Sequence, residues 1–240
     1  MKFKTSITQI KDGKEIIRGE ALENLIATRS FTETIYLVLK GELPSEAHKR
    51  MLDAILTSVI DHGPAVASAM SARISASAKN PTHTSLAGGL LSLGERHGVA
   101  VGDAMQFFYD HVAGEDLEAL LKERKEKKQY LSGYGHKVFD IDPRSQALFV
   151  IAKEVDVFGK YCEFALRVEQ TLNSMSSKKL PLNVDGAIGA ILCDMGFDAR
   201  LGNSVFMIGR VPGLLAHIYE EQTSGEGIRR LEDDEVEYSK

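Results

Sequence analysis

Four short segments of the chain place a histidine or an aspartate beside glycine. They are residues 61–64 (Asp-His-Gly-Pro), 94–98 (Gly-Glu-Arg-His-Gly), 132–137 (Ser-Gly-Tyr-Gly-His-Lys) and 182–186 (Leu-Asn-Val-Asp-Gly). Glycine permits turns that other residues avoid, so each titratable side chain is expected at a loop or helix end, where ligands can approach and backbone donors are available. Such a set suits proton transfer, although the residue types alone name no reaction.

Two other kinds of site are less well supported. The Gly133-Tyr134-Gly135 stretch could cradle a phosphate, but it does not match a Walker A loop and has no strand-then-helix context of a dinucleotide fold. No histidine, cysteine and carboxylate grouping has metal-ligand spacing, so no metal is expected. Cys162 and Cys193 lack CxxC spacing, which predicts two buried free thiols in a reducing compartment.

Helices must position most of these residues, because apolar side chains recur at spacings of three, four and seven. One stripe consists of Leu148, Ile151, Val155, Cys162 and Leu166. Another follows a helix start at Pro44 and Ser45 and consists of Met51, Ala54, Ile55 and Val59. The sequence therefore predicts a mainly α fold.

Two further segments have recognisable patterns. Residues 116–128 are typical of a charged helix with one solvated face. Alternating β-patterns are scarce, and only residues 2–10 and 14–17 favour a short hairpin around Asp12-Gly13.

Length and composition limit the number of domains and the classes of partner that the chain can have. Its 240 residues suffice for a substantial core in one large or two small domains. A net charge of −5 argues against nucleic acid, and an anionic small ligand would need a local basic pocket. No apolar run reaches the ~18–20 residues of a membrane span. Residues 1–5 lead into polar sequence without an apolar signal core, so we expect a cytoplasmic protein without a membrane partner.

The order of the motifs resembles that of the citrate synthase superfamily. Residues 133–138, followed by Asp142-Pro143-Arg144, resemble its glycine-rich histidine loop and Asp-Pro-Arg motif. Further segments resemble the catalytic aspartate segment (183–186), the late arginine helix (209–217) and the N-terminal landmarks (17–19 and 41–44). The resemblance covers nearly the whole chain.

Within this family the chain is similar to the citryl-CoA lyase branch, which includes the C-terminal module of ATP-citrate lyase. Residues 61–66 differ from ordinary citrate synthases after the histidine, Ser177-Lys178-Lys179 precedes the aspartate segment, and the chain is short. His97 instead favours the synthase branch. It matches a histidine that citrate synthases have and that the ATP-citrate lyase module lacks. The chain thus combines the catalytic residues of a citrate synthase with other sequence features of the citryl-CoA lyase branch.

The resemblance implies a citryl-CoA lyase that forms acetyl-CoA and oxaloacetate through an acetyl-CoA enol. Asp185 would exchange a proton with the acetyl methyl group, His97 would hydrogen-bond the developing enolate, and His136 would transfer the proton of the citryl hydroxyl. One alternative is a citrate synthase or 2-methylcitrate synthase, which also hydrolyses the thioester and releases citrate or its homologue. A less favoured alternative is a non-catalytic helical dimer that binds CoA or an acyl-CoA.

Substrate contacts are also implied by the resemblance. Arg144 and Arg210 match arginines that bind substrate carboxylates, for which guanidinium forks are well suited. His62 matches a histidine that touches the substrate. Arg230 resembles an arginine that reaches the neighbouring subunit's site, and Arg229 remains open as the alternative.

CoA would lie along the loop of residues 132–137, with Gly133, Tyr134, Gly135 and Lys137 as contacts. Lys137 stands where many relatives have arginine. Lys178 and Lys179 are candidate phosphate contacts, and a solvated turn is an equally good interpretation of them. The other histidines, namely His48, His83, His111 and His217, are expected to be structural.

The implied architecture is a citrate-synthase-like fold of two helical domains with an active-site cleft between them. Residues 1–97 and 190–240 would form the large domain. Residues 98–189 would form the small domain, which carries the CoA loop and the catalytic aspartate. Closure of the cleft would exclude water and so preserve the thioester. We expect a homodimer or higher homo-oligomer, with a citryl-CoA synthetase as a candidate partner.

Overall fold

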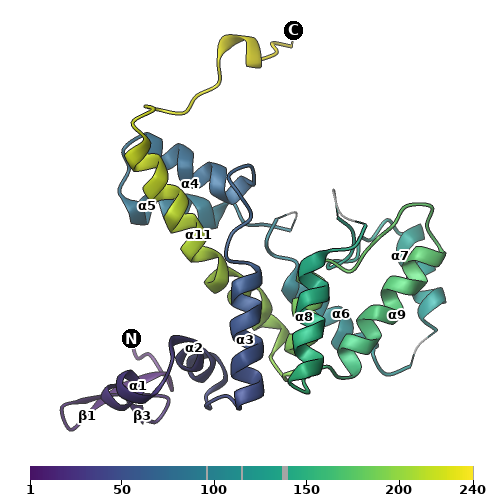
Figure 1. The fold of residues 1–240 in the computed structure, drawn as a ribbon, viewed down its shortest axis with the longest axis horizontal. Helices are drawn as coiled ribbons and strands as arrows, with labels where there is room; N and C mark the ends of the chain where they lie inside the picture. Colours follow the sequence, from purple (N-terminus) through teal and green to yellow (C-terminus); the bar gives the residue numbers. More distant parts are fainter. Residues whose placement is uncertain (96, 115, 137–139, 240) are drawn as a thin grey trace. The chain divides into compact units, whose positions relative to one another are not determined.

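A computed structural model describes residues 1–95, 97–114, 116–136 and 140–239, and this part of the chain is mainly helical (Figure 1). The elements are β1 (Thr8–Lys11), β2 (Lys14–Ile17), β3 (Glu20–Ala21), α1 (Leu22–Thr28), α2 (Phe31–Lys40), α3 (Glu46–Ser58), α4 (Ala67–Ser77), α5 (Thr82–Leu91), α6 (Val101–His111), α7 (Leu117–Glu126), α8 (Pro143–Glu154), α9 (Lys160–Ser174), α10 (Val184–Asp194), η1 (Ala199–Leu201), α11 (Gly202–Ser224) and η2 (Asp233–Glu235). The predicted mainly α fold is confirmed.

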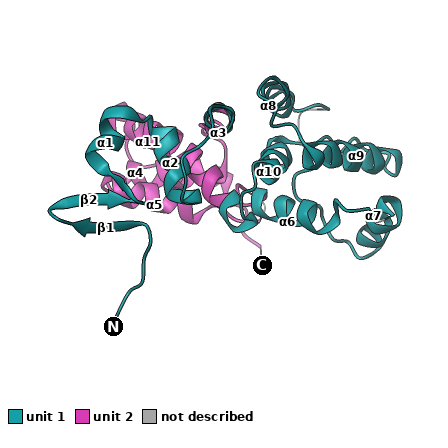
Figure 2. Ribbon diagram, turned by 90° about the horizontal axis from the view of Figure 1, so that it is seen from below, with its two compact units in different colours: residues 1–55, 101–202 teal, residues 56–100, 203–240 magenta. Residues whose placement is uncertain are grey.

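The described chain divides into two compact units (Figure 2). Unit 1 comprises Met1–Ile55 and Val101–Gly202, and unit 2 comprises Leu56–Ala100 and Asn203–Lys240. The predicted domain division at residues 97–98 and 189–190 stays a prediction. None of the described helices is long and apolar enough to span a bilayer.

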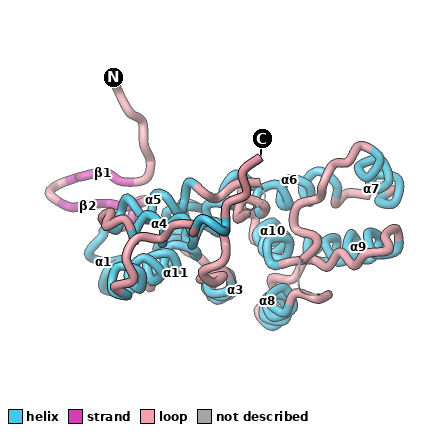
Figure 3. Tube along the Cα trace, turned by 90° about the horizontal axis from the view of Figure 1, so that it is seen from above, coloured by secondary structure: helices cyan, strands magenta, loops and turns pink. Residues whose placement is uncertain are grey.

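A small antiparallel sheet lies near the N-terminus of unit 1 (Figure 3). β1 pairs with β2, and β2 pairs with β3. Asp12 and Gly13 join the first two strands with φ angles of 51° and 72°, which is the left-handed geometry that a two-residue hairpin turn requires. The predicted hairpin is confirmed, although its first strand begins at Thr8, where the register with β2 starts.

The core of unit 1 forms around α10, which packs against α6, α8 and α9. Residues 186–193 of α10 are all buried, as expected of a helix that is apolar on every side. Phe107 and Phe108 of α6 contact the ring of Phe164 on α9, with centroids 6.1 and 6.2 Å apart. This packing fixes the start of α10, where Asp185 lies.

The apolar stripe from Leu148 to Leu166 runs over two helices rather than one. α8 ends at Glu154, and α9 begins at Lys160. Asp194, at the end of α10, accepts hydrogen bonds from the backbone N–H groups of Gly159, Tyr161 and Cys162 at 3.0–3.1 Å and so caps the start of α9. A carboxylate distant in sequence therefore stabilises the break.

The two cysteines are buried free thiols, as predicted. Burial raises the pKa of Cys162 and of Cys193, because it disfavours the thiolate. The charge of Asp194 acts in the same direction on both groups.

Unit 2 is built from α4, α5 and the part of α11 that follows Gly202. Figure 1 shows α11 alongside α4 and α5, and a core of small and branched side chains joins α4 to α11. It consists of Ala69, Ala72, Ala76, Leu214 and Ile218. Gly89 of α5 approaches α4 so closely that an added Cβ would lie 3.0 Å from the Ser68 carbonyl oxygen. Small residues therefore let these helices pack tightly.

Candidate active site

Asp185 lies in the first turn of α10, and its residue type and position suit a base. Asn183 caps this helix, since its Oδ1 accepts from the N–H groups of Asp185 at 3.1 Å and Gly186 at 3.2 Å. The positive end of the helix dipole favours a negative charge at this position. The Oδ1 atom of Asp185 is inaccessible to solvent. A carboxylate is thus held, partly buried, at a helix start.

The glycine-rich loop lies directly on the start of α10. Gly133 has a φ of +90°, and an added Cβ would stand 2.6 Å from the Cα of Gly186. The Gly133 carbonyl accepts from the N–H of Asn183 at 3.0 Å, and the Asn183 side-chain amide donates to the Gly135 carbonyl at 3.0 Å. The structure therefore brings the loop that leads into His136 together with the Asp185 segment.

Tyr134 anchors this loop from within. Its hydroxyl donates to the Ala165 carbonyl of α9 at 3.0 Å. Burial, and then the charge of Glu169, raises the pKa of Tyr134 well above its ordinary value, so the hydroxyl stays protonated. The side chain holds the loop in place and leaves the loop backbone as the surface that a ligand could meet. Lys137, the last predicted contact of this loop, lies outside the described residues.

Arg144 lies in the first turn of α8 and is held by Asp142. Its Nε donates to Asp142 Oδ1 at 3.0 Å and its Nη2 to Oδ2 at 2.8 Å. Asp142 Oδ2 also accepts from the N–H of Val184 at 3.0 Å, which ties the starts of α8 and α10 together. Burial alone would raise the pKa of Asp142, but the hydrogen bonds and charge of Arg144 and the Val184 N–H outweigh it and lower the pKa.

Lys178 and Lys179 line a cavity of 390 Å³. Lys179 Nζ lies 3.3 Å from Asp140 Oδ2, and both side chains are exposed, so this ion pair contributes little by itself. A second cavity of 360 Å³ in unit 1 combines apolar walls with Arg124, Lys125 and Lys128, and Tyr134 also lines it. The 360 Å³ cavity has the mixed apolar and cationic lining that suits an anionic ligand with an apolar part, whereas the cavity at Lys178 and Lys179 is also lined by Asp140 and Glu169.

His97 of unit 2 has its ring tautomer fixed by α4. Its Nε2 lies 2.8 Å from Ser68 Oγ and accepts from the Ser68 backbone N–H at 3.4 Å. Because a backbone N–H can only donate, the proton of the neutral ring lies on Nδ1. Burial, and then the charge of Arg210, lowers the pKa of His97. A neutral imidazole with an Nδ1–H donor is the result.

Arg210 is 3% exposed and lies on α11 in unit 2. Its Nε donates to the Val59 carbonyl at 2.7 Å, and its guanidinium lies 5.0 Å from the centre of the Phe206 ring. An added Cβ at Gly209 would stand 2.5 Å from Val59 Cγ2, so glycine permits this close packing. His62 follows three residues after Val59, in the exposed segment that leads to α4.

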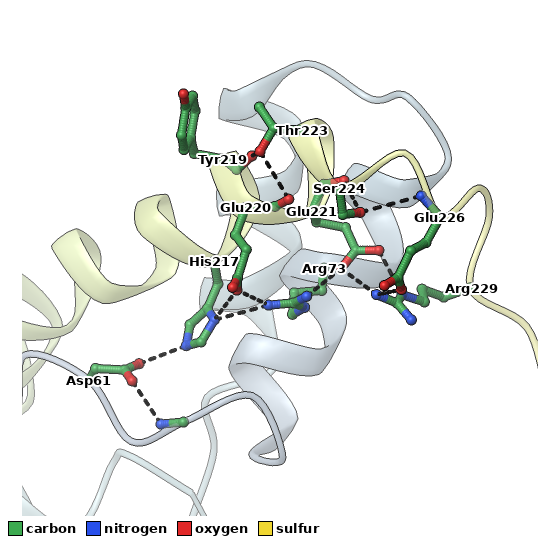
Figure 4. Close-up of polar contacts among 11 residues, drawn as sticks. Asp61, Arg73, His217, Tyr219, Glu220, Glu221, Thr223, Ser224, Glu226 and Arg229 are labelled. Atoms are coloured by element: carbon green, nitrogen blue, oxygen red, sulfur yellow. Dashed lines mark hydrogen bonds and ion pairs between the residues drawn. The ribbon is translucent and has the colours of Figure 1, made fainter.

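The two candidate arginines near the C-terminus differ in their surroundings (Figure 4). Arg229 Nε donates to Glu221 at 2.6 Å, and its Nη2 lies 2.6 Å from Glu226. Arg230 has a side chain that is 75% exposed and lies 4.0 Å from Glu232. Arg229 therefore anchors the tail on α11, and the accessibility of Arg230 favours it as the residue that could reach another molecule.

The predicted site residues form two sets. Unit 1 holds Asp185, His136, Arg144, the glycine loop, Lys178 and Lys179, and unit 2 holds His62, His97, Arg210 and Arg230. Sequence analysis missed Asp142 and Ser68 as supporting residues. Asp before Pro at a helix start was a usable signal for Asp142, whereas nothing local marks Ser68. Among the described residues, no group of three histidines, cysteines or carboxylates could hold a metal ion.

Comparisons with known proteins agree on one family. Residues 44–231 match the family model "Citrate synthase, C-terminal domain". The structure resembles citryl-CoA lyase from Hydrogenobacter thermophilus with a TM-score of 0.94 and 46% identity, over 99% of this chain and 94% of that one. It also resembles ATP citrate lyase of Methanosaeta concilii in complex with (3S)-citryl-CoA, with a TM-score of 0.88 and 27% identity over 100% of this chain and 42% of that one.

A curated relative, the probable ATP-citrate synthase of Dictyostelium discoideum, is 31% identical over 85% of this chain. The chain spans 35% of that relative's length.

Proposed function

The chain belongs to the citrate synthase family, and from this premise we propose that it is a citryl-CoA lyase, which cleaves citryl-CoA to acetyl-CoA and oxaloacetate. The observation that carries the proposal is the 46% identity to a citryl-CoA lyase over nearly the full length of both chains. The citrate-synthase-like fold expected from the sequence agrees with this likeness.

In the proposed reaction, His136 takes the proton of the citryl hydroxyl as the carbon–carbon bond breaks. The hydroxyl carbon becomes the ketone of oxaloacetate, and the bonding electrons move into the thioester to give the enolate of acetyl-CoA. The neutral His97 donates from Nδ1–H to the developing enolate oxygen, and its lowered pKa suits this role. Asp185, which carries a proton when citryl-CoA binds, then delivers it to the enol carbon, which yields the methyl group of acetyl-CoA. After product release, His136 loses its proton to solvent and Asp185 regains one.

We propose that the substrate carboxylates are bound by Arg144 and Arg210, with His62 as a further contact. The bidentate hold of Asp142 on Arg144 orients that guanidinium before substrate arrives. Burial of Arg210 strengthens its attraction for an anion. Arg230, extended into solvent, is proposed to complete the site of a neighbouring subunit.

CoA enters this proposal as part of the substrate and product, and the reaction uses no metal. The backbone of Gly133, Tyr134 and Gly135, together with Lys137, would follow the thioester arm. The cationic groups at the two cavities of unit 1, including Lys178 and Lys179, suit the phosphates.

We propose a further set of features for the architecture, assembly and location of the protein. These are the large domain of residues 1–97 and 190–240, the small domain of residues 98–189, the cleft between them, a homodimer or larger homo-oligomer, a citryl-CoA synthetase partner and a cytoplasmic location. Measurement of mass in solution by light scattering tests the oligomer directly.

A citrate synthase or 2-methylcitrate synthase is the second candidate, because His97 has the neutral, donor-ready form that condensation also requires. The two activities share bond chemistry and differ in thioester hydrolysis. Purified protein should therefore receive citryl-CoA, with oxaloacetate, acetyl-CoA, citrate and free CoA quantified separately. Equal amounts of oxaloacetate and acetyl-CoA with little free CoA support the lyase, whereas citrate and free CoA as main products would show a synthase.

Asp185→Asn is the matched variant for this assay. An enzyme should lose turnover and keep its affinity for CoA, because the amide preserves the shape of the side chain and removes the carboxyl group that transfers the proton. If the wild-type protein binds CoA but transforms neither citryl-CoA nor acetyl-CoA plus oxaloacetate, the chain is a binding protein instead.

A further inference from the structure

Three successive residues before His62 contact one face of α11. The Val59 carbonyl accepts from Arg210 Nε at 2.7 Å, and Asp61 Oδ1 lies 3.0 Å from His217 Nε2. Between them, an added Cβ at Gly213 would overlap the Ile60 carbonyl oxygen. Positions 210, 213 and 217 follow the spacing of three and four that places residues on one side of a helix. Residues 59–61, which lead to His62, therefore pack along one side of α11.

His217 joins this segment to a cluster of charges (Figure 4). Arg73 Nη1 lies 3.3 Å from His217 Nδ1, and Arg73 also contacts Glu220 at 2.5 Å and Glu221 at 2.8 Å. A guanidinium can only donate, so His217 Nδ1 accepts and the ring proton lies on Nε2. That proton is donated to Asp61. His217 therefore joins Asp61 to Arg73, and Glu220 Oε2 also lies 3.9 Å from its Nδ1.

The two carboxylate oxygens of Asp61 bind different groups. Oδ1 accepts from His217 on α11, while Oδ2 accepts from the backbone N–H of Gly63 at 2.9 Å. Burial would raise the pKa of Asp61, but hydrogen bonds from the Gly63 and His62 backbone and from His217 outweigh it and lower the pKa. The carboxylate thus fixes the backbone on both sides of His62.

We propose that Asp61 and His217 are positioning residues that hold His62 in the orientation in which it meets the substrate. This inference rests on the proposed function, in which His62 contacts citryl-CoA. Neither residue needs to touch the substrate, because Asp61 acts through the turn and His217 acts through Asp61. Arg73 and Glu220 fix the ring of His217 from the other side.

Three variants test this arrangement. His217→Ala removes the donor to Asp61, whereas His217→Gln keeps an N–H that can donate to Asp61 and an oxygen that can accept from Arg73. Asp61→Asn removes one of the two carboxylate acceptors. His83→Ala is the matched control, because His83 is an exposed histidine on α5. Circular dichroism and thermal melting first establish that each variant is folded.

Two readouts separate positioning from stability. The first is KM and kcat for citryl-CoA cleavage at a temperature well below every melting point. We expect His217→Ala and Asp61→Asn to lower kcat/KM by about 10- to 100-fold, since a displaced substrate contact costs this much, and His217→Gln to recover most of it. The second is the ring chemical shift and pH titration of His62 by NMR without substrate. Both should change in the same two variants and remain unchanged in His83→Ala.

The outcomes distinguish this inference from the proposed function. Active wild-type protein whose kcat/KM and His62 titration are the same in all four variants would overturn the inference and leave the lyase proposal intact. Inactive wild-type protein would overturn the lyase proposal, while the His62 titration would still decide whether Asp61 and His217 position that ring. If His217→Ala does not fold, His217→Gln and Asp61→Asn carry the comparison.

Discussion

Gly133 and Gly186 meet backbone to backbone, with no room for a side chain on either one. An added Cβ on Gly133 would stand 2.6 Å from the Gly186 Cα, and one on Gly186 would overlap the Gly133 carbonyl. The obstructing atoms are main-chain atoms, which cannot move aside as a flexible side chain can. This contact presses the glycine loop onto the helix that carries Asp185.

Gly186→Ala should therefore destabilise the protein by about 1–3 kcal/mol, the usual cost of overpacking a tight interior. It should also lower turnover, because the loop before His136 must lift away from α10. Urea denaturation and citryl-CoA cleavage measure the two effects. Gly88→Ala is the control, because Gly88 is a helical glycine with its nearest neighbours at 3.9 Å and alanine is the better helix former. Equal stability of the two variants would contradict the role of the Gly133 contact.

Asp142→Asn should weaken both the hold on Arg144 and the junction of α8 with α10. Since Asp142 is fully buried, we expect a loss of about 3 kcal/mol in the free energy of unfolding, in the range for breaking a buried pair. Its folded-state pKa is lowered, so its contribution is complete above the ordinary aspartate pKa and is lost as pH falls through the lower folded value. The difference in the free energy of unfolding between wild type and variant, measured by urea denaturation, should accordingly disappear at acid pH. If this difference in the free energy of unfolding does not change with pH, the charge of Asp142 does not contribute to stability.

His97 should titrate below the ordinary histidine pKa of 6.5, with its neutral-state proton on Nδ1. Imidazole nitrogen shifts measured by NMR across a pH series report both properties. Arg210→Gln should raise the pKa of His97, because it removes a positive charge that disfavours the imidazolium. His97→Ala should lower kcat by about 100-fold or more, the usual effect of losing an oxyanion donor. An Nε2–H tautomer in the wild type would contradict the acceptor role given to Nε2.

Glu221→Gln should release the C-terminal segment from α11. The Glu221 side chain is fully buried between Arg73 and Arg229, and its pKa is lowered chiefly by hydrogen bonds from Arg229. Loss of its charge leaves two guanidiniums facing an amide, which should cost about 3 kcal/mol. Glu226→Gln is the control, since Glu226 contacts Arg229 from the exposed surface and should change stability by less than about 1 kcal/mol. Limited proteolysis after Ser224 measures release of the C-terminal segment in the two variants, and urea denaturation measures their stability.

Sequence patterns predicted elements whose determinants are local. The hairpin depends on Asp12-Gly13, and the helix expected over residues 116–128 is observed as Leu117–Glu126 with Asp116 as its cap. The break between α8 and α9 could not be predicted, because its cap is Asp194, which is 32 to 35 residues away in sequence. Hydrophobic periodicity continued across the break and concealed it.

The same distinction holds for the candidate site. The family motifs drew attention to His97 and Asp185, but their supporting partners come from elsewhere in the chain. Ser68, which sets the tautomer of His97, is 29 residues away, and Gly133, which abuts the Asp185 helix, is separated from Gly186 by the whole of α8 and α9. Such partners are fixed by packing, and no local pattern encodes them.

The face of α11 that meets residues 59–61 constrains how the gene can change. A helix turns by about 100° for each residue, so one inserted or deleted codon between positions 210 and 217 would rotate His217 away from the side that Arg210 occupies. Leu215, which is more than one-third exposed, can vary in identity without this effect. The interval from Arg210 to His217 should thus tolerate many replacements at its outward positions and no change in length.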